Sequence, residues 1–380
     1  MKNFKAGVVG TGFIGVAHVE ALRRIGNIEV VAISDSFNAE EKAKVMNIPH
    51  WFHDYKDMIS KMELDVIHVC TPNNTHYEIS KYAMERGINV VCEKPVTTTV
   101  KEAEELLKIA KEKKLIHAVN FHNRFNPMVY ELKKMIQDNS LGEIFSIHGA
   151  YLQDWLLYDT DYNWRIKSKE SGSTRVVADL GSHWMDTVEN ITGLRITEVF
   201  AEFTIYHKIR KRLLKPSNFI PEESLKPEDY EEIHIDTEDA AFIIFRFSNG
   251  AKGNLALSQM FAGRKNKLSI FVAGTKESAE WDSENINGLY LGRRNNYNQI
   301  VVKDTNLLHK ATADIVSYPG GHVEGFPDTI KQNFIKIYKS LEDKSMDREY
   351  ATFEDGARSM KLCEKIFESA QTSKWVNVMK

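Results

Sequence analysis

Cysteine is scarce in this chain of 380 residues, which contains only Cys70, Cys92 and Cys363. These cysteines lie in apolar, strand-like or helix-like settings and have neither disulfide nor metal-ligand spacing. We therefore expect core residues in a protein of the reducing cytoplasm, and no metal site. Long apolar runs are also absent, since none approaches the roughly 18–20 residues that a membrane helix needs. Met1–Phe4 lead directly into an apolar segment, so we expect no signal peptide.

A strong charge of one sign is missing as well. The 50 Lys and Arg residues and the 53 Asp and Glu residues are well interspersed and give a formal net charge of −3. Such a surface produces no field suited to nucleic acid or to an anionic membrane, so a small molecule is the expected partner. Because the chain exceeds the usual limit of about 250–300 residues for one core, we expect two domains.

What the sequence does contain is a glycine-rich turn near its start, Gly10-Thr11-Gly12-Phe13-Ile14-Gly15. This turn follows an apolar run and opens an amphipathic stretch that extends to Ile25, which is the strand–turn–helix context of a dinucleotide fingerprint. The first glycine permits the tight turn, the second lets the backbone approach a pyrophosphate, and the third lets the helix pack on the strand. A glycine-rich turn without a ligand is the alternative.

An acidic residue is expected about 20 positions after the fingerprint, at the end of the second strand. Asp35 stands there and closes the apolar run Ile28–Ser34. A carboxylate at this point accepts hydrogen bonds from the ribose diol of NAD and repels the 2′-phosphate of NADP. Ser36 follows it, where an NADP enzyme often has Arg, although a serine can still hydrogen-bond a phosphate. The sequence therefore favours NAD over NADP.

The hydrophobic pattern divides the chain into two parts. In residues 1–122, short apolar runs alternate with helical periodicity, which predicts a Rossmann domain with a doubly wound parallel sheet. Residues 123–350 contain longer alternating segments, which predict an α+β domain built on a large, mostly antiparallel open sheet. Asn249-Gly250 marks a hairpin between two of its strands. In residues 351–380, an amphipathic helix is expected to pack back near the first domain.

Residues 207–232 interrupt this pattern. They carry a basic cluster and then an acidic cluster, with Pro216, Pro221 and Pro227 along the way. Both charge signs and three prolines predict an exposed, solvated connection, and a binding element is the alternative.

Lys94 is the first candidate for chemistry. Glu93-Lys94-Pro95 follows an apolar strand that ends at Cys92. Ligands of doubly wound sheets bind beyond the carboxyl ends of the strands, so Lys94 is placed where a nicotinamide ring would lie. A surface Glu–Lys pair is the alternative.

Asp179 and His183 are the second candidates. They are four residues apart, so on a helix they share one face and bring a carboxylate and an imidazole together. A neutral histidine can accept the proton that a hydroxyl group loses when hydride leaves its carbon. Lys94 could polarise the oxygen. His322, flanked by glycines, could reach a ligand or simply occupy a turn.

The chain resembles the Gfo/Idh/MocA family of oxidoreductases over nearly its whole length. The family is named for glucose–fructose oxidoreductase and inositol dehydrogenase. Besides the residues above, the matching motifs are Thr71-Pro72-Asn73 with His76, Asn123-Arg124-Phe125-Asn126-Pro127 and Trp164-Arg165. Their combination is specific for the family but not for a substrate.

This resemblance implies a role for each matching residue. Thr71, Pro72, Asn73 and His76 would line the cofactor track, and Glu93 and Lys94 would touch the ribose and the reacting centre. Lys94, Asp179 and His183 match the catalytic trio of the family. Trp164 and Arg165 match a site at the nicotinamide end, and Arg124 matches a conformational or cofactor-side position. The resemblance also implies dimer or tetramer contacts through the open face of the second sheet.

One departure concerns Ser171-Gly172-Ser173-Thr174-Arg175, where many relatives carry a glycine triplet. Ser173 and Arg175 there could narrow or polarise the pocket. The aromatic stretch Tyr151–Trp155, with Tyr158 and Tyr162, is more similar to the family branch that acts on sugars and glycosides than to the biliverdin reductases. Stacking aromatic rings with amide and carboxylate groups suit polyols, which makes Asp154 and Tyr162 candidate substrate residues, whereas sheet core is the alternative.

The leading hypothesis is an NAD-dependent dehydrogenase that oxidises a secondary hydroxyl group of a sugar, glycoside or cyclitol, with His183 taking the proton. A second is a glycosidase that holds NAD tightly and oxidises carbon 3 transiently. A third is a sensor that binds NAD(H) without turnover, against which the acid–base set argues.

Overall fold

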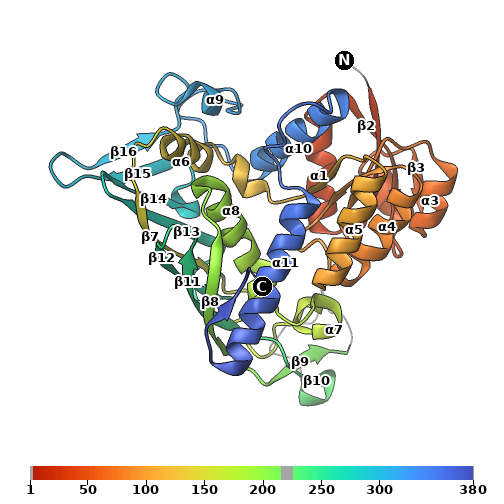
Figure 1. The fold of residues 1–380 in the computed structure, drawn as a ribbon. Helices are drawn as coiled ribbons and strands as arrows, with labels where there is room; N and C mark the ends of the chain where they lie inside the picture. Colours follow the sequence, from red (N-terminus) through yellow and green to blue (C-terminus); the bar gives the residue numbers. More distant parts are fainter. Residues whose placement is uncertain (1–2, 215–225, 380) are drawn as a thin grey trace.

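The structure is a computed structural model that describes residues 3–214 and 226–379. It contains a six-stranded sheet, a nine-stranded sheet and a two-stranded ribbon. Figure 1 shows the six-stranded sheet and its helices on one side of the molecule and the nine-stranded sheet on the other, with α10 (Phe326–Glu342) and α11 (Phe353–Thr372) between them. A site formed between the two sheets can therefore draw residues from both halves of the chain.

The first sheet is entirely parallel, with the order β3-β2-β1-β4-β5-β6. Its strands are β1 (Phe4–Val9), β2 (Ile28–Ser34), β3 (His50–Phe52), β4 (Val66–Val69), β5 (Asn89–Cys92) and β6 (His117–Val119). The connecting helices are α1 (Phe13–Arg23), α2 (Ala39–Val45), α3 (Tyr55–Lys61), α4 (His76–Glu85) and α5 (Val100–Glu112). The predicted Rossmann fold is confirmed. The strand order reverses between β1 and β4, where such sheets bind ligands.

The second sheet is mixed but mostly antiparallel, with the order β16-β15-β14-β13-β7-β12-β11-β8-β17. Only β7 and β12 run parallel. Its strands are β7 (Ile144–Leu152), β8 (Ile196–Thr204), β11 (Ala240–Phe247), β12 (Lys252–Ser258), β13 (Lys267–Gly274), β14 (Ser278–Asp282), β15 (Gly288–Gly292), β16 (Gln299–Val302) and β17 (Val376–Asn377). The large sheet is confirmed, as is the hairpin at Asn249-Gly250, which joins β11 to β12.

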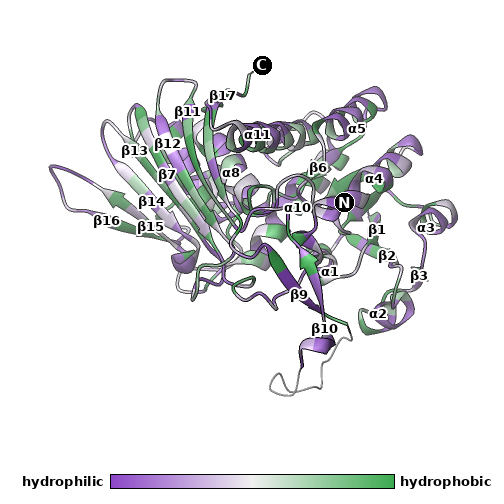
Figure 2. Ribbon diagram, turned by 90° about the horizontal axis from the view of Figure 1, so that it is seen from below, coloured by the Kyte–Doolittle hydropathy of each residue, from purple (hydrophilic) through white to green (hydrophobic). Residues whose placement is uncertain are grey.

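Helices cover one face of this sheet (Figure 2). The helices of this half are α6 (Pro127–Gln137), α7 (Ser168–Ser171), α8 (Ser182–Thr192) and α9 (Lys310–Ala313). The Trp184 indole of α8 is buried and donates a hydrogen bond to the Ser269 carbonyl oxygen of β13 at 3.1 Å. Gly149 of β7 makes room for this indole, because a Cβ there would collide with its Nε1 atom. Close packing thus fixes the height of α8, which carries His183, above the sheet.

The C-terminal helices return to the first half of the chain. Helix α10 packs on α1, and its Phe334 and Tyr338 lie in the same buried cluster as Phe4 of β1. Residues 326–342, which the sequence placed with the second domain, thus complete the core of the first. Helix α11 contacts α5 and β6 on one side and β8 on the other. The predicted boundary between the two domains, after residue 122, stays a proposal.

The segment predicted to be an exposed connection is partly strand, so that prediction was wrong. β9 (Ile209–Leu213) and β10 (Tyr230–His234) form an antiparallel ribbon. Residues 215–225 lie outside the described residues. The error arose because Arg210 was counted as a surface charge, whereas it is fully buried against Asp239. In the described part of the chain, no helix is long and apolar enough to span a bilayer.

Candidate active site

A cleft of about 900 Å³ lies at the carboxyl ends of β1, β2 and β4. This is the edge of a doubly wound sheet at which dinucleotides bind. Many predicted cofactor residues line the cleft, namely Gly10, Gly12, Phe13, Ile14, Asp35, Ser36, Thr71, Pro72, Trp164 and Arg165. Gly15 lies behind it and is buried.

The three glycines of the fingerprint are required for different reasons. A Cβ on Gly10 would lie 2.8 Å from the Cys70 carbonyl oxygen, and its φ of +85° is unfavourable for other residues. A Cβ on Gly15 would collide with the Gly10 carbonyl oxygen. Gly12 has an ordinary φ of −68°, and no atom lies within 4 Å of a Cβ placed there. The protein itself does not need glycine at position 12, so the open space before α1 fits a ligand that approaches the backbone.

The start of α1 also fits an anion. Gly12 is its N-cap residue, and no side chain caps the helix. The free amide groups and the positive end of the helix dipole attract phosphate oxygens. The residues present therefore fit the pyrophosphate of a dinucleotide.

Asp35 is a fixed, ionised carboxylate at the rim of this cleft. Its Oδ2 accepts hydrogen bonds from the Thr11 amide at 2.9 Å and from Lys42 Nζ at 3.1 Å. Burial raises the pKa of Asp35, but the hydrogen bonds from Thr11, Phe37 and Lys42 outweigh it and lower this pKa to about 2. The carboxylate keeps its charge at neutral pH and would disfavour a phosphate on a ribose bound beside it.

A second cavity of about 430 Å³ continues from the cleft. The two share Phe13, Ile14, Thr71, Trp164 and Arg165 as lining residues. Further predicted residues line the second cavity, namely Asn73, His76, Glu93, Lys94 and His183. The structure thus brings residues from both halves of the chain around one connected space.

Lys94 lines the second cavity and pairs with Asp179, which lies behind it and is not among the described lining residues. Lys94 Nζ donates to Asp179 Oδ1 and to the Asp179 carbonyl oxygen, both at 2.8 Å. Gln259 Nε2 donates to Asp179 Oδ2 at 3.0 Å, and Arg165 Nε lies 3.6 Å from Oδ1. Burial raises the pKa of Asp179, but the charges of Lys94 and Arg165 outweigh it, so the pKa lies below its usual value. Asp179 is an ionised anchor for the ammonium group.

His183 lies on α8 among the rings of Phe121, His122 and Tyr151. Burial, and then the Lys94 charge, lower the pKa of His183 well below its usual value, so the imidazole is neutral. Its Nδ1 atom is buried and has no hydrogen-bond partner among the described residues. A neutral imidazole in the cavity can accept a proton.

The predicted contact between Asp179 and His183 is not found among the hydrogen bonds and ion pairs of the described residues. The reason is local. Residues Val177–Gly181 form a π-helical turn that precedes α8. In such a turn the backbone hydrogen bonds join residues five apart instead of four, so the side chains are spaced differently from those of the α-helix that the prediction assumed. Asp179 pairs with Lys94 instead, and His183 faces the rings.

Glu93 lines the cavity but is held from behind. Its Oε1 lies 2.8 Å from His18 Nε2 and accepts a hydrogen bond from Asn120 Nδ2 at 2.6 Å. Burial raises the pKa of Glu93, and hydrogen bonds from His18 and Asn120 lower it to about 2. A buried chain continues from His18 through His68 to Tyr338. His18 and His68 were missed in the sequence because their partners are far along the chain.

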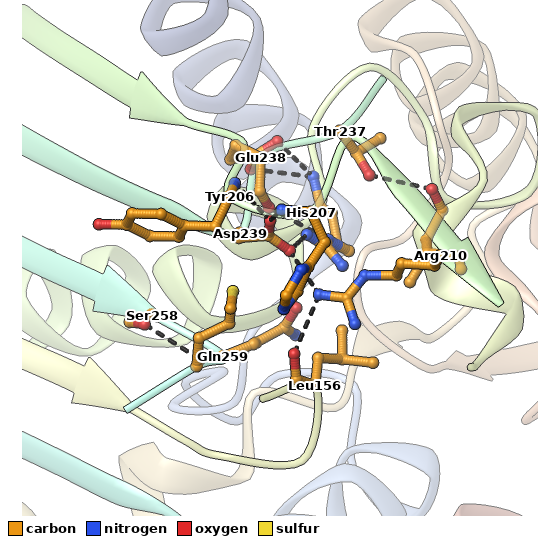
Figure 3. A network of polar contacts seen from close by, with 12 residues as sticks. Leu156, Tyr206, His207, Arg210, Thr237, Glu238, Asp239, Ser258 and Gln259 are labelled. Carbon is orange, nitrogen blue, oxygen red and sulfur yellow. Dashed lines mark hydrogen bonds and ion pairs between the residues drawn. The ribbon is translucent and has the colours of Figure 1, made fainter. Parts of the chain in front are cut away.

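A buried charge cluster supports the start of the helix that bears Asp179 (Figure 3). Glu238 accepts hydrogen bonds from the backbone amides of Arg175 and Val177, at 2.9 Å each to Oε1. Asp239 binds the guanidinium groups of Arg175 and Arg210. Arg175 therefore does not narrow the pocket, as the sequence suggested it could, because its side chain is buried against Glu238 and Asp239.

Arg124 was predicted to bind the cofactor. It is not one of the described residues that line the cleft or the second cavity. Its guanidinium is buried and binds Asp186 of α8 and Asp355 of α11. It joins three segments of the chain, which suits the conformational role that the resemblance left open.

Besides Asp179, three predicted substrate residues lie outside both cavities, as far as the described residues define them. Asp154 binds Lys265 Nζ at 2.7 Å, and Tyr162 packs under the cations of Lys167 and Arg212. His322 is exposed on a loop. These residues are therefore not part of the proposed site. The sequence could not show this, because a polar or aromatic residue near a sheet carries no signal of which side it faces.

Several lining residues were missed in the sequence, namely His122, Asn266, Leu268, Trp281, Ser283, Ile286, Phe326 and Thr329. Leu268 and Trp281 come from the second sheet and Phe326 and Thr329 from α10, where no motif marks them. His122 did carry a signal, because it follows β6 at the carboxyl edge of the first sheet. No cluster of residues suited to a metal ion is found in the described residues.

Comparison with known proteins agrees with this geometry. Residues 4–121 match the model of an oxidoreductase family with an NAD-binding Rossmann fold, and residues 129–280 match the GFO/IDH/MocA C-terminal domain. Levoglucosan dehydrogenase of Pseudarthrobacter phenanthrenivorans is 27% identical over 75% of this chain and 75% of its own. Glucose-6-phosphate 3-dehydrogenase of Bacillus subtilis is 24% identical over 98% of each chain. The solved structure of a levoglucosan dehydrogenase in complex with NADH and L-sorbose has a TM-score of 0.88 at 24% identity, covering 100% of this chain and 99% of its own, which shows a shared fold.

Proposed function

The chain belongs to the Gfo/Idh/MocA family of oxidoreductases, with an NAD-binding Rossmann fold in its N-terminal part, and from this premise we propose that it oxidises a secondary hydroxyl group of a sugar, glycoside or cyclitol. The observation that carries the proposal is the cavity in which neutral His183 lies with Lys94, continuous with the cleft at Gly12 and Asp35. The names of the relatives, which act on sugars, support the substrate class.

The proposed chemistry divides among three side chains. NAD, bound in the cleft, supplies the carbon that accepts the hydride. His183 takes the proton that the hydroxyl group loses, since its low pKa leaves it unprotonated at neutral pH. Lys94 has three N–H donors and gives hydrogen bonds to two oxygens of Asp179, which leaves a donor for the substrate oxygen. Asp179, itself held by Gln259, keeps the ammonium group in place.

The test is to follow absorbance of reduced nicotinamide while the protein is mixed with NAD or NADP and a panel of sugars, glycosides and inositols. Accumulation of NADH with one class of polyol is the expected result. NAD binding without NADH accumulation in any mixture would overturn the proposal and favour transient oxidation in a glycosidase, or a sensor. A Lys94→Met variant is the matched control, because NADH that forms at this site should form much more slowly without the Lys94 ammonium group.

We further propose that a second copy of the chain covers the open face of the nine-stranded sheet. Strand β11 alternates between buried residues and exposed ones, and its exposed positions include Phe242 and Ile244, at 52% and 46% exposure. Apolar side chains exposed in a row favour association. Light scattering should give a dimer or tetramer, and Phe242→Glu should reduce the mass. A monomeric wild-type protein would contradict this proposal.

We propose the cytoplasm as the compartment. The supporting observation is that Cys70, Cys92 and Cys363 are buried free thiols, as expected for a reducing environment. Fractionation of the source cells would test it.

A further inference from the structure

His122 is a second imidazole in the cavity, which the proposed chemistry does not use. It follows β6 and lines the cavity together with Lys94 and His183. The ring centroids of His122 and His183 are 5.3 Å apart. Whatever hydroxyl group reaches His183 brings its neighbouring groups close to His122.

The hydrogen bonds around His122 fix which of its nitrogens carries a proton. Thr329 Oγ1 donates its single hydrogen to the Phe326 carbonyl oxygen at 2.9 Å. Thr329 Oγ1 also lies 3.0 Å from His122 Nδ1. Because its hydrogen is already used, this hydroxyl oxygen can only accept a hydrogen bond from His122. His122 Nδ1 must carry the proton in this contact. In the neutral ring, Nε2 is then left with a lone pair.

The ring is neutral in this setting. Burial lowers the pKa of His122 to about 4, with Glu93 raising it and Lys94 lowering it by smaller amounts. His122 Nδ1 has a hydrogen-bond partner, whereas His122 Nε2 has none among the described residues. The cavity wall thus presents an oriented hydrogen-bond acceptor beside His183.

We propose that His122 Nε2 accepts a hydrogen bond from the hydroxyl group next to the one that is oxidised, so that the cavity selects a vicinal diol. This inference rests on the proposed function and names the substrate class of the same site. Two neutral imidazoles side by side match two adjacent O–H donors. Thr329 is the positioning residue, because it holds the ring in the tautomer that leaves Nε2 unprotonated.

The test compares two amide variants of His122. The amide oxygen of His122→Gln can reach the position of Nε2, whereas His122→Asn extends only to the position of Nδ1 and keeps the contact with Thr329. We expect His122→Asn to weaken binding of the diol by about 3- to 10-fold, the range for one neutral hydrogen bond. We expect His122→Gln to restore most of it.

The probes are levoglucosan, methyl β-D-glucopyranoside, scyllo-inositol and their monodeoxy analogues, titrated calorimetrically into the protein saturated with NADH and assayed for NAD reduction. The wild-type protein should lose affinity for one monodeoxy analogue, and His122→Asn should no longer distinguish that analogue from its parent. Thr329→Val should raise KM more than it lowers kcat, and Thr329→Ser should behave as the wild type. These two variants keep the imidazole itself.

Failure of this inference differs from failure of the proposed function. NADH formation by His122→Asn at the wild-type rate and affinity would overturn the diol contact and leave the dehydrogenase intact. Sugar binding that depends on His122 without any NADH formation would overturn the dehydrogenase and support the contact. An equal loss for the parent and all deoxy analogues in His122→Asn would overturn the contact, as would the absence of any sugar binding.

Discussion

Lys94 and Asp179, 85 residues apart in the chain, are joined twice, because Lys94 Nζ lies 2.8 Å from both the carboxylate and the carbonyl oxygen of Asp179. One residue follows the last buried strand before α5, and the other lies in the π-helical turn before α8. The pair thus connects the half of the chain that forms the dinucleotide cleft to the half that carries His183. The positive charge of Lys94 lowers the pKa of both Asp179 and His183.

Replacing Lys94 should change the pH dependence as well as the rate. Burial, and next the Lys94 charge, lower the pKa of His183, so Lys94→Met should raise that pKa. A base works only when unprotonated, and activity is lost as pH falls through its pKa. The acidic limb of kcat/KM should therefore move to higher pH, with a rate loss of about 100-fold or more.

Lys94→Arg is the control for this prediction, since it keeps the positive charge and should keep the acidic limb near its wild-type position. An unchanged limb in Lys94→Met would show that the ammonium group does not act on the base.

His183→Ala should abolish most turnover and leave NAD binding nearly intact. The reason is location, because His183 lines the second cavity but not the cleft at Asp35, as far as the described residues define it. Loss of a positioned base costs about 10²–10⁴-fold in rate. Fluorescence titration with NADH and steady-state assays separate the two effects. A parallel loss of cofactor affinity would contradict the assignment of His183 as the base.

Two glycine variants should separate ligand binding from folding. Gly12→Ala meets no protein atom within 4 Å, so its melting temperature without NAD should equal that of the wild type. The rise in melting temperature that NAD produces should be reduced, because the methyl group occupies the space before α1. Gly10→Ala, with a φ of +85°, should instead lose about 1–3 kcal/mol of stability. Equal melting behaviour of the two variants with and without NAD would contradict this division.

The parts of the site that could be predicted from sequence are those encoded locally. Gly12, Asp35 and Lys94 each follow a buried parallel strand, and the carboxyl ends of such strands meet at one edge of the sheet. The order of apolar runs therefore places these residues in space. The large second sheet was predicted for a similar reason, since alternation over many short segments is itself a local pattern.

The parts that could not be predicted depend on partners far along the chain. Arg210 looked like a surface charge because nothing near it in sequence showed that Asp239, 29 residues later, is buried beside it. His18 contacts Glu93 across 75 residues. Asp154 and Tyr162 lie near the site in sequence, yet the direction of a side chain leaving a loop depends on packing that periodicity does not contain.

Asp35 should determine the choice of cofactor. Its carboxylate binds Lys42 Nζ at 3.1 Å, so Asp35→Ser removes a negative charge and frees a cation beside the ribose site. The ratio of NADP to NAD affinity should rise by about 10- to 100-fold, the effect of one or two hydrogen bonds to a charged group. Ser36→Ala is the control and should change the ratio little. An unchanged preference in Asp35→Ser would move the specificity to other residues of the cleft.

Asp239, which binds Arg210 of β9, should contribute more to stability than an exposed acid that pairs with the same strand. Asp239 and its partners Arg175 and Arg210 are fully buried, so Asp239→Asn leaves two guanidinium groups without their shared counter-charge. Removing one partner of a buried ion pair costs about 3–5 kcal/mol. Urea unfolding should show this loss.

Asp159 provides the matched comparison, because its pair with Lys211 of β9 is 40% and 44% exposed. An exposed pair contributes about 0–1 kcal/mol, so Asp159→Asn should unfold close to the wild type. The start of the helix that bears Asp179 depends on the same cluster, through Arg175 and Glu238. Asp239→Asn should therefore also lower kcat, even at temperatures where the variant remains folded. A folded variant with wild-type kcat would show that the cluster supports the fold but does not position Asp179.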